Sequence, residues 1–176
     1  MDWPGAERIE TPRLTLEPLR VGHAGEMVDV LGAPALYAFT GGAPPSLERL
    51  RVRYARQAAG HSPDGRHGWL NWIARERDTG IAVGTVQATL TRRDGRLEAE
   101  IAWVIGVAHQ RRGYATEAAG AMVRWLGAQG VQTITAHIHP DHRASMGVAR
   151  HLGLAPTNVI DDGETRWQGP LAGGDS

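Results

Sequence analysis

Hydrophobic and polar positions along the chain recur with two different periods, which separate the expected strands from the expected helices. A period of two predicts strands at 13–17, 69–75, 81–90, 97–105 and 133–139, with a short last edge strand at 164–167. A period of 3.6 predicts helices at 25–31, 47–59 and 144–151, and a fourth that follows Gly113 and ends near 127–130. The pattern therefore predicts a domain built from both helices and strands.

The order of these elements predicts a mixed sheet. Two turns, at 77–80 and 93–96, separate three consecutive strands, which is typical of an antiparallel meander. The strand, helix and strand that follow imply a parallel pair joined by a right-handed crossover. We expect one α/β domain over 8–170, with flanking helices and with loose termini at 1–7 and 171–176.

Composition narrows the class of protein. The 176 residues suit one domain, and a formal net charge of zero argues against a nucleic-acid partner. The chain has no cysteine, which removes disulfides, thiolate nucleophiles and Cys-based zinc sites. No apolar run approaches about eighteen residues and the N-terminus is not a signal peptide, so we expect no membrane partner and a cytoplasmic location. The sequence leaves a homodimer open.

The most informative stretch joins the strand at 97–105 to the helix after Gly113. The stripe of Ala115, Ala118, Ala119 and Met122 fixes the helix, so the amide groups of 113–116 lack intrahelical partners. Those amides and the helix dipole favour an anion, and a glycine allows close approach of the backbone. The turn suits a pyrophosphate. All nineteen basic residues are arginine, so it is not a phosphate loop that requires lysine, and no G-x-G-x-x-G follows an early strand.

Three motifs in order resemble the GNAT superfamily of N-acyltransferases. Gln110-x-x-Gly113-x-Ala115, with Val107 three residues earlier, resembles its acyl-CoA pyrophosphate loop, Q/R-x-x-G-x-G/A. Residues 11–16 look like the opening strand of the branch that includes ribosomal-protein N-terminal acetyltransferases. Residues 139–145, followed by Leu-Gly-Leu at 152–154, look like the late segment P-x-N-x-x-S … L-G-F, in which His142 stands where relatives commonly carry asparagine.

The resemblance implies transfer of an acyl group, most simply acetyl from acetyl-CoA, to a primary amine on a small molecule or a protein N-terminus. It implies a co-substrate site at Trp103, Val104, Ile105, Val107, Gln110, Arg111, Arg112, Gly113, Tyr114, Ala115, Thr116, His142 and Ser145. Glu100, which shares a strand face with Glu98, is the expected base, because in similar enzymes this strand lines the cleft where amine meets thioester. A backbone amide at 103–105 would polarise the thioester oxygen. Ser145 would protonate the departing thiolate.

Two other readings stay open. The chain could bind acyl-CoA as a sensor without catalysis. Alternatively, His137-x-His139-x-Asp141-His142 resembles the signature of metallo-β-lactamase-type hydrolases, but only 34 residues follow it, with His151 as their single histidine. We therefore expect no metal. We also expect Glu117 to be structural, the tryptophans to form core or cleft walls, and the arginines of the 47–59 helix (Arg49, Arg51, Arg53 and Arg56) to form a solvated face.

Overall fold

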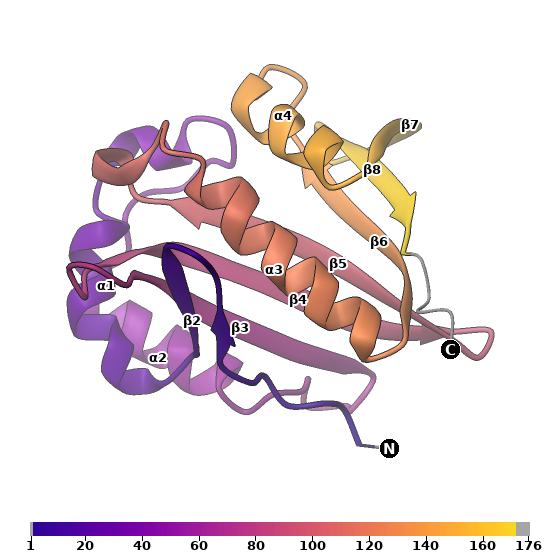
Figure 1. Ribbon diagram of the computed structural model, residues 1–176, viewed down its shortest axis with the longest axis horizontal. Helices are drawn as coiled ribbons and strands as arrows, with labels where there is room; N and C mark the ends of the chain where they lie inside the picture. Colours follow the sequence, from indigo (N-terminus) through magenta and orange to yellow (C-terminus); the bar gives the residue numbers. More distant parts are fainter. Residues whose placement is uncertain (1, 172–176) are drawn as a thin grey trace.

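A single mixed sheet organises the molecule (Figure 1). The computed structural model describes residues 2–171, so our expectations for residue 1 and for the tail beyond Leu171 lie outside the described residues. The strands run in the order β1-β2-β3-β4-β5-β6-β8-β7, with β5 and β6 parallel and the other neighbours antiparallel. Their bounds are β1 Ile9–Glu10, β2 Leu14–Pro18, β3 His67–Glu76, β4 Ala82–Arg93, β5 Arg96–Ile105, β6 Val131–Ile138, β7 Ala155–Asp161 and β8 Glu164–Pro170.

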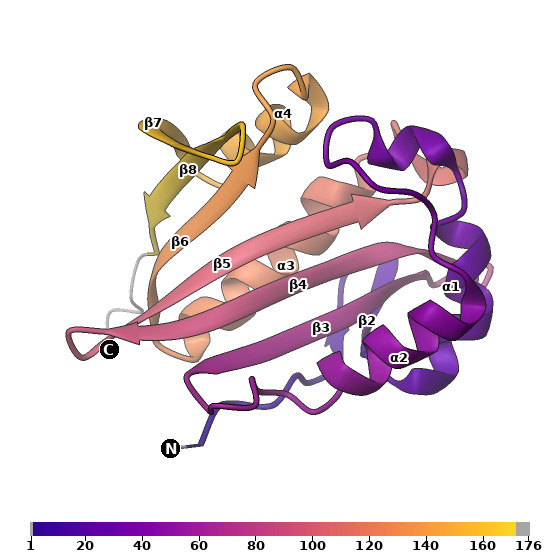
Figure 2. The ribbon, with the colours of Figure 1, turned by 180° about the vertical axis from the view of Figure 1, so that it is seen from behind.

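Helices cover the two faces of the sheet unequally. The helix α3 lies along one face, and Figure 2 shows α1 and α2 at one end of the opposite face. The α-helices are α1 Ala24–Val30, α2 Leu47–Gln57, α3 Tyr114–Ala128 and α4 Arg143–His151, and short 3₁₀ turns occur at Val21–His23, Pro34–Tyr37 and Val107–His109. Among the described residues, no helix is long and apolar enough to cross a membrane.

The alternation along β4 and β5 explains which face each helix covers. Leu97, Ala99 and Ile101 on β5 are buried in the main core together with Met122 and Leu126 of α3. A smaller core lies under α1 and α2, around Met27, Leu50 and Ile73. The residues between the buried positions, such as Glu100 on β5, point to the face that α1 and α2 cover only in part. The sheet thus has one apolar face and one partly open, polar face.

The fold confirms the predicted meander and the parallel strand–helix–strand unit. The predicted edge strand at 164–167 is misplaced, because β8 lies between β6 and β7, and β7 forms the edge. The pattern missed β7, since most of its residues are exposed and it carries no alternation. The N-terminal segment, which we expected to be loose, makes specific contacts: the Trp3 indole N–H donates to the Gly65 carbonyl at 3.0 Å, and the Trp72 indole donates to the Glu7 carbonyl at 2.7 Å.

Candidate active site at the end of the fifth strand

The turn between β5 and α3 has the backbone geometry that an anion site requires. Gly113 caps the helix in the left-handed region, with φ of 79°, and Arg111 has φ of 65°. The first helical hydrogen bond runs from the Glu117 amide to the Gly113 carbonyl at 3.0 Å, and no side chain caps the helix. The amides of 113–116 therefore precede the helical pattern, as the sequence predicted, and can meet a negatively charged group.

Side chains from distant parts of the chain hold this turn in place. Arg13 donates from Nη1 to the Arg112 carbonyl at 2.8 Å and pairs through Nε with Glu117 Oε1 at 2.7 Å. Glu117 also accepts from the Thr11 hydroxyl at 2.6 Å. Burial opposes ionisation of Glu117, but these bonds from Thr11 and Arg13 outweigh it and hold the pKa of the carboxyl below its ordinary value. Glu117 is structural, as expected.

Two of the expected co-substrate residues point their side chains into the protein. Gln110 donates from Nε2 to the Ile105 carbonyl at 2.9 Å, which closes the turn on itself. Tyr114 is buried and donates its hydroxyl to Glu76 on β3, and this hydrogen bond lowers the pKa of Glu76. Both side chains brace the turn, so only their backbone groups remain for a ligand. Arg112 stays half-exposed, and its Nη1 lies 3.8 Å from Glu76 Oε2.

The strands β5 and β6 separate next to this turn. Their parallel pairing covers only Leu97 to Glu100, opposite Val131 to Thr135, although β5 continues to Ile105 and β6 to Ile138. Beyond Glu100, the 101–105 segment of β5 is paired with β4 alone. Among the described residues, the other edge of 101–104 therefore has no strand partner and can hydrogen-bond an extended ligand, whereas the Ile105 carbonyl already accepts from Gln110. Of the three residues expected there, Val104 is exposed, Trp103 packs partly against the core and Ile105 is buried.

Glu100 lies where the two strands part and heads a chain of polar side chains. Its Oε1 is 2.9 Å from His137 Nδ1, and His137 Nε2 is 3.1 Å from Asp161 on β7. His137 thus lies between two carboxyl groups, with one ring nitrogen within hydrogen-bond distance of each. Sequence reasoning missed this use of His137 and missed Asp161 altogether, because β7 itself was not predicted.

Ser145 and His142 lie together at the start of α4. His142 caps the helix by accepting the Ser145 amide on Nδ1 at 3.4 Å, and its Nε2 lies 3.1 Å from Ser145 Oγ. Burial, aided by the neighbouring His139, lowers the pKa of His142. A neutral ring that accepts at Nδ1 carries its proton on Nε2, so His142 donates to Ser145 Oγ. The serine hydroxyl proton remains available for another acceptor.

The connection between α1 and α2 reaches the start of α4. The Phe39 ring stacks on the His142 ring at 4.6 Å between centroids and lies 5.1 Å from that of His139. His139 and His142 therefore share Phe39, whereas His137 contacts Glu100 and Asp161. Among residues 2–171, no three His, Cys, Asp or Glu side chains converge to hold a metal ion.

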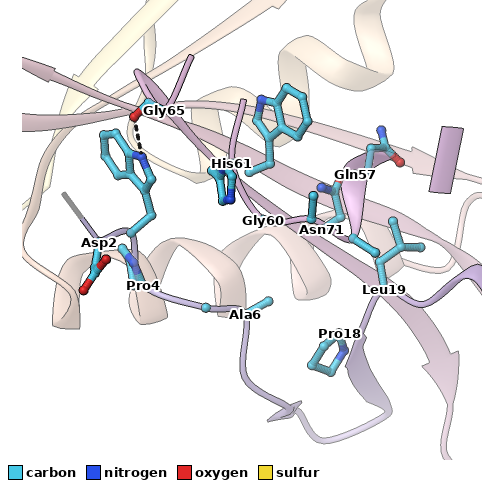
Figure 3. A pocket seen from close by; sticks show the side chains of 15 residues that line it. Asp2, Pro4, Ala6, Pro18, Leu19, Gln57, Gly60, His61, Gly65 and Asn71 are labelled. Atoms are coloured by element: carbon cyan, nitrogen blue, oxygen red, sulfur yellow. Dashed lines mark hydrogen bonds between the residues drawn. The ribbon is translucent and has the colours of Figure 1, made fainter. Parts of the chain in front are cut away.

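Two hollows open on the polar side of the sheet, and none of the expected site residues lines either one. The larger, of about 560 Å³, lies between the N-terminal segment and the end of α2, and Figure 3 shows Asp2, Pro4, Leu19, Gln57, His61 and Asn71 around it. The smaller, of about 310 Å³, shares Gln57, Trp69 and Asn71 with the first and reaches Thr89 on β4. Thr89 is the cross-strand partner of Glu100.

Comparison with known proteins identifies the family to which this chain is similar. Residues 13–155 match the model of the acetyltransferase (GNAT) domain. An acetyltransferase from Agrobacterium tumefaciens superposes with a TM-score of 0.70 at 24% identity, covering 96% of each chain. A GNAT-family acetyltransferase from Bacillus anthracis gives 0.69 at 18% identity, covering 92% of this chain and 95% of its own.

A third solved structure is the ribosomal L7/L12 α-N-protein acetyltransferase RimL in complex with coenzyme A. It superposes with a TM-score of 0.78 at 15% identity, covering 95% of this chain and 99% of its own. No curated protein matches the chain in sequence. The domain match spans most of the chain, and acetyl-CoA is the co-substrate of the enzymes in this family. The chain belongs to the GNAT acetyltransferase family.

Proposed function

We propose that this protein transfers acetyl from acetyl-CoA to a primary amine by direct attack within a ternary complex. The observation that carries the proposal is the separation of β5 from β6 beside the Gly113 turn. The turn offers amides for the pyrophosphate, and the edge of β5 at 101–104 offers hydrogen bonds along the pantetheine arm. A co-substrate held in both places would bring its thioester close to Glu100.

Glu100 is the proposed base. An amine reaches the site largely protonated and must lose a proton before its lone pair can attack the carbonyl carbon. The Glu100 carboxyl group is half-exposed and contacts His137, so it is open to the acceptor side. A proton taken by Glu100, directly or through water, returns to solvent from the half-exposed carboxyl group.

The unpaired backbone of β5 and the start of α4 supply the remaining groups. An amide at 103–105 would donate to the thioester oxygen as it becomes an oxyanion. When the C–S bond breaks, the thiolate needs a proton, and the Ser145 hydroxyl is free to donate one because His142 already donates to its oxygen. A proton from solvent would then restore the serine hydroxyl. The products are the N-acetyl amine and free CoA.

The test is amine-dependent release of free thiol from acetyl-CoA across a library of primary amines, with the acetylated product identified by mass spectrometry. We expect one acetylated amine for each thiol released. Acetyl-CoA that binds but releases no thiol with any amine would contradict the proposal and would favour a sensor.

A further inference from the structure

The smaller hollow on the polar side of the sheet has the composition of an anion site. Arg53 and Arg56 of α2 form one wall, and Gln57, Asn71, Gln87 and Thr89 provide hydrogen-bonding groups around it. The Arg56 guanidinium lies over the Trp69 ring, 5.3 Å from its centroid. A flat cation fixed on an aromatic face keeps its N–H groups directed toward a ligand.

Among residues 2–171, the lining of this hollow contains two guanidinium groups and no carboxylate. Arg13, Arg75 and Arg77 all pair with carboxylates. Within the described part of the chain, the side chains of Arg53 and Arg56 make no ion pair and donate no hydrogen bond, although both border a hollow. The sequence led us to expect these arginines on a solvated face, and Arg51, Arg53 and Arg56 are all exposed. Arg53 and Arg56 differ from Arg51 because they line the hollow, and Arg56 also lies over the Trp69 ring.

The strand register connects this hollow to Glu100. Trp69 on β3 pairs with Thr89 on β4, which pairs with Glu100 on β5. Paired residues point to the same face, so Trp69, Thr89 and Glu100 form one row across three neighbouring strands. Two strand spacings amount to about 10 Å. The carboxyl groups of Glu100 and Asp161 lie at one end of the row, and the guanidinium groups of Arg53 and Arg56 lie at the other.

We propose that the hollow between α2 and the β3–β4 strands binds an anionic group of the acceptor, and that the acceptor is an amine bearing a carboxylate or phosphate about 10 Å from its nitrogen. This inference rests on the proposed function, because it places the reacting amine at Glu100. An extended peptide N-terminus with an acidic third residue has the required length, since two residues rise about 7 Å and the side chain adds the rest. An ω-amino acid of similar length has the same chemistry.

Two pairs of probes that differ in charge and keep their shape test the proposal. The first pair is Ala-Ala-Asp amide and Ala-Ala-Asn amide, and the second is 8-aminooctanoate and its amide. N-acetylated forms of all four are titrated into the protein while the Trp69 indole N–H resonance is followed by NMR, so binding is measured without turnover. The unacetylated forms are assayed with acetyl-CoA by thiol release.

We expect the charged member of at least one pair to bind about 10- to 100-fold more tightly than its neutral partner. The Arg53→Gln/Arg56→Gln double variant should lose that preference, and the matched control Arg51→Gln, which lies outside the hollow, should keep it. The pair that shows the preference identifies the peptide or the small-molecule source.

Equal binding of both members in both pairs, or a preference that survives in the double variant, would overturn the anion site. A preference in binding that depends on Arg53 and Arg56, with no acetyl transfer to any amine, would support the anion site and would count against the proposed acetyltransferase reaction instead. The two failures are therefore distinguishable.

Discussion

The two ends of the site are built in opposite ways. At the Gly113 turn, the protein pairs its own polar groups: Arg13 with Glu117, and Tyr114 with Glu76. At α2, Arg53 and Arg56 make no ion pair among residues 2–171. The co-substrate is always the same molecule, so rigid, preorganised backbone groups can bind it. We expect the acceptor to be bound instead by side chains that have no internal partner. Glu100 lies between the Gly113 turn and the α2 arginines.

Among the changes considered, removal of the proposed base, Glu100, should lower turnover the most. Glu100→Gln keeps the shape of the side chain and removes its charge, so turnover should fall by roughly 10²–10⁴ with affinity for acetyl-CoA nearly unchanged. Higher pH should partly rescue the variant, because more of the amine arrives deprotonated. Steady-state kinetics from about pH 6 to 9.5 measure both. Wild-type turnover throughout that range would end the candidacy of Glu100.

At the co-substrate end, loss of the proposed proton donor, Ser145, should lower kcat by a smaller factor. Ser145→Ala removes the hydroxyl beside His142, and we expect kcat to fall about 10- to 100-fold while KM for acetyl-CoA stays similar. His142→Asn is the matched control for folding, because asparagine is as good an N-cap and should leave the melting temperature nearly unchanged. A full kcat in Ser145→Ala would show that water protonates the thiolate instead.

The Arg13–Glu117 pair should contribute stability only above a defined pH. The folded-state pKa of Glu117 lies below its ordinary value of 4.5, so its contribution is complete above about pH 4.5 and is lost as the pH falls through the folded value. Glu117→Gln should therefore lower the free energy of unfolding by about 1–3 kcal/mol at pH 7 and by less near pH 4. Urea denaturation measures this, with Glu48→Gln, exposed on α2, as the control. A pH-independent difference would contradict the argument.

The sequence predicted what local spacing determines. The glycine turn, the α3 stripe and the alternation of β5 are encoded within a few residues, and all were found where expected. The missed features join distant segments: Arg13 with Glu117, Phe39 with His142, and Glu100 with Asp161 through His137. Such contacts depend on strand order and register, which a hydrophobic pattern does not specify when, as in β7, most residues are exposed.

Calorimetric titration of CoA into Gly113→Val tests the central claim most directly, because it concerns the backbone at the turn alone. Valine at φ of 79° is strained, and its side chain would block the amides, so we expect affinity to fall at least about tenfold. Gly130→Val is the matched control: Gly130 is also left-handed, with φ of 92°, but lies at the far end of α3, so CoA affinity should be kept. Unchanged CoA binding in a folded Gly113→Val variant would contradict the assignment of the co-substrate site.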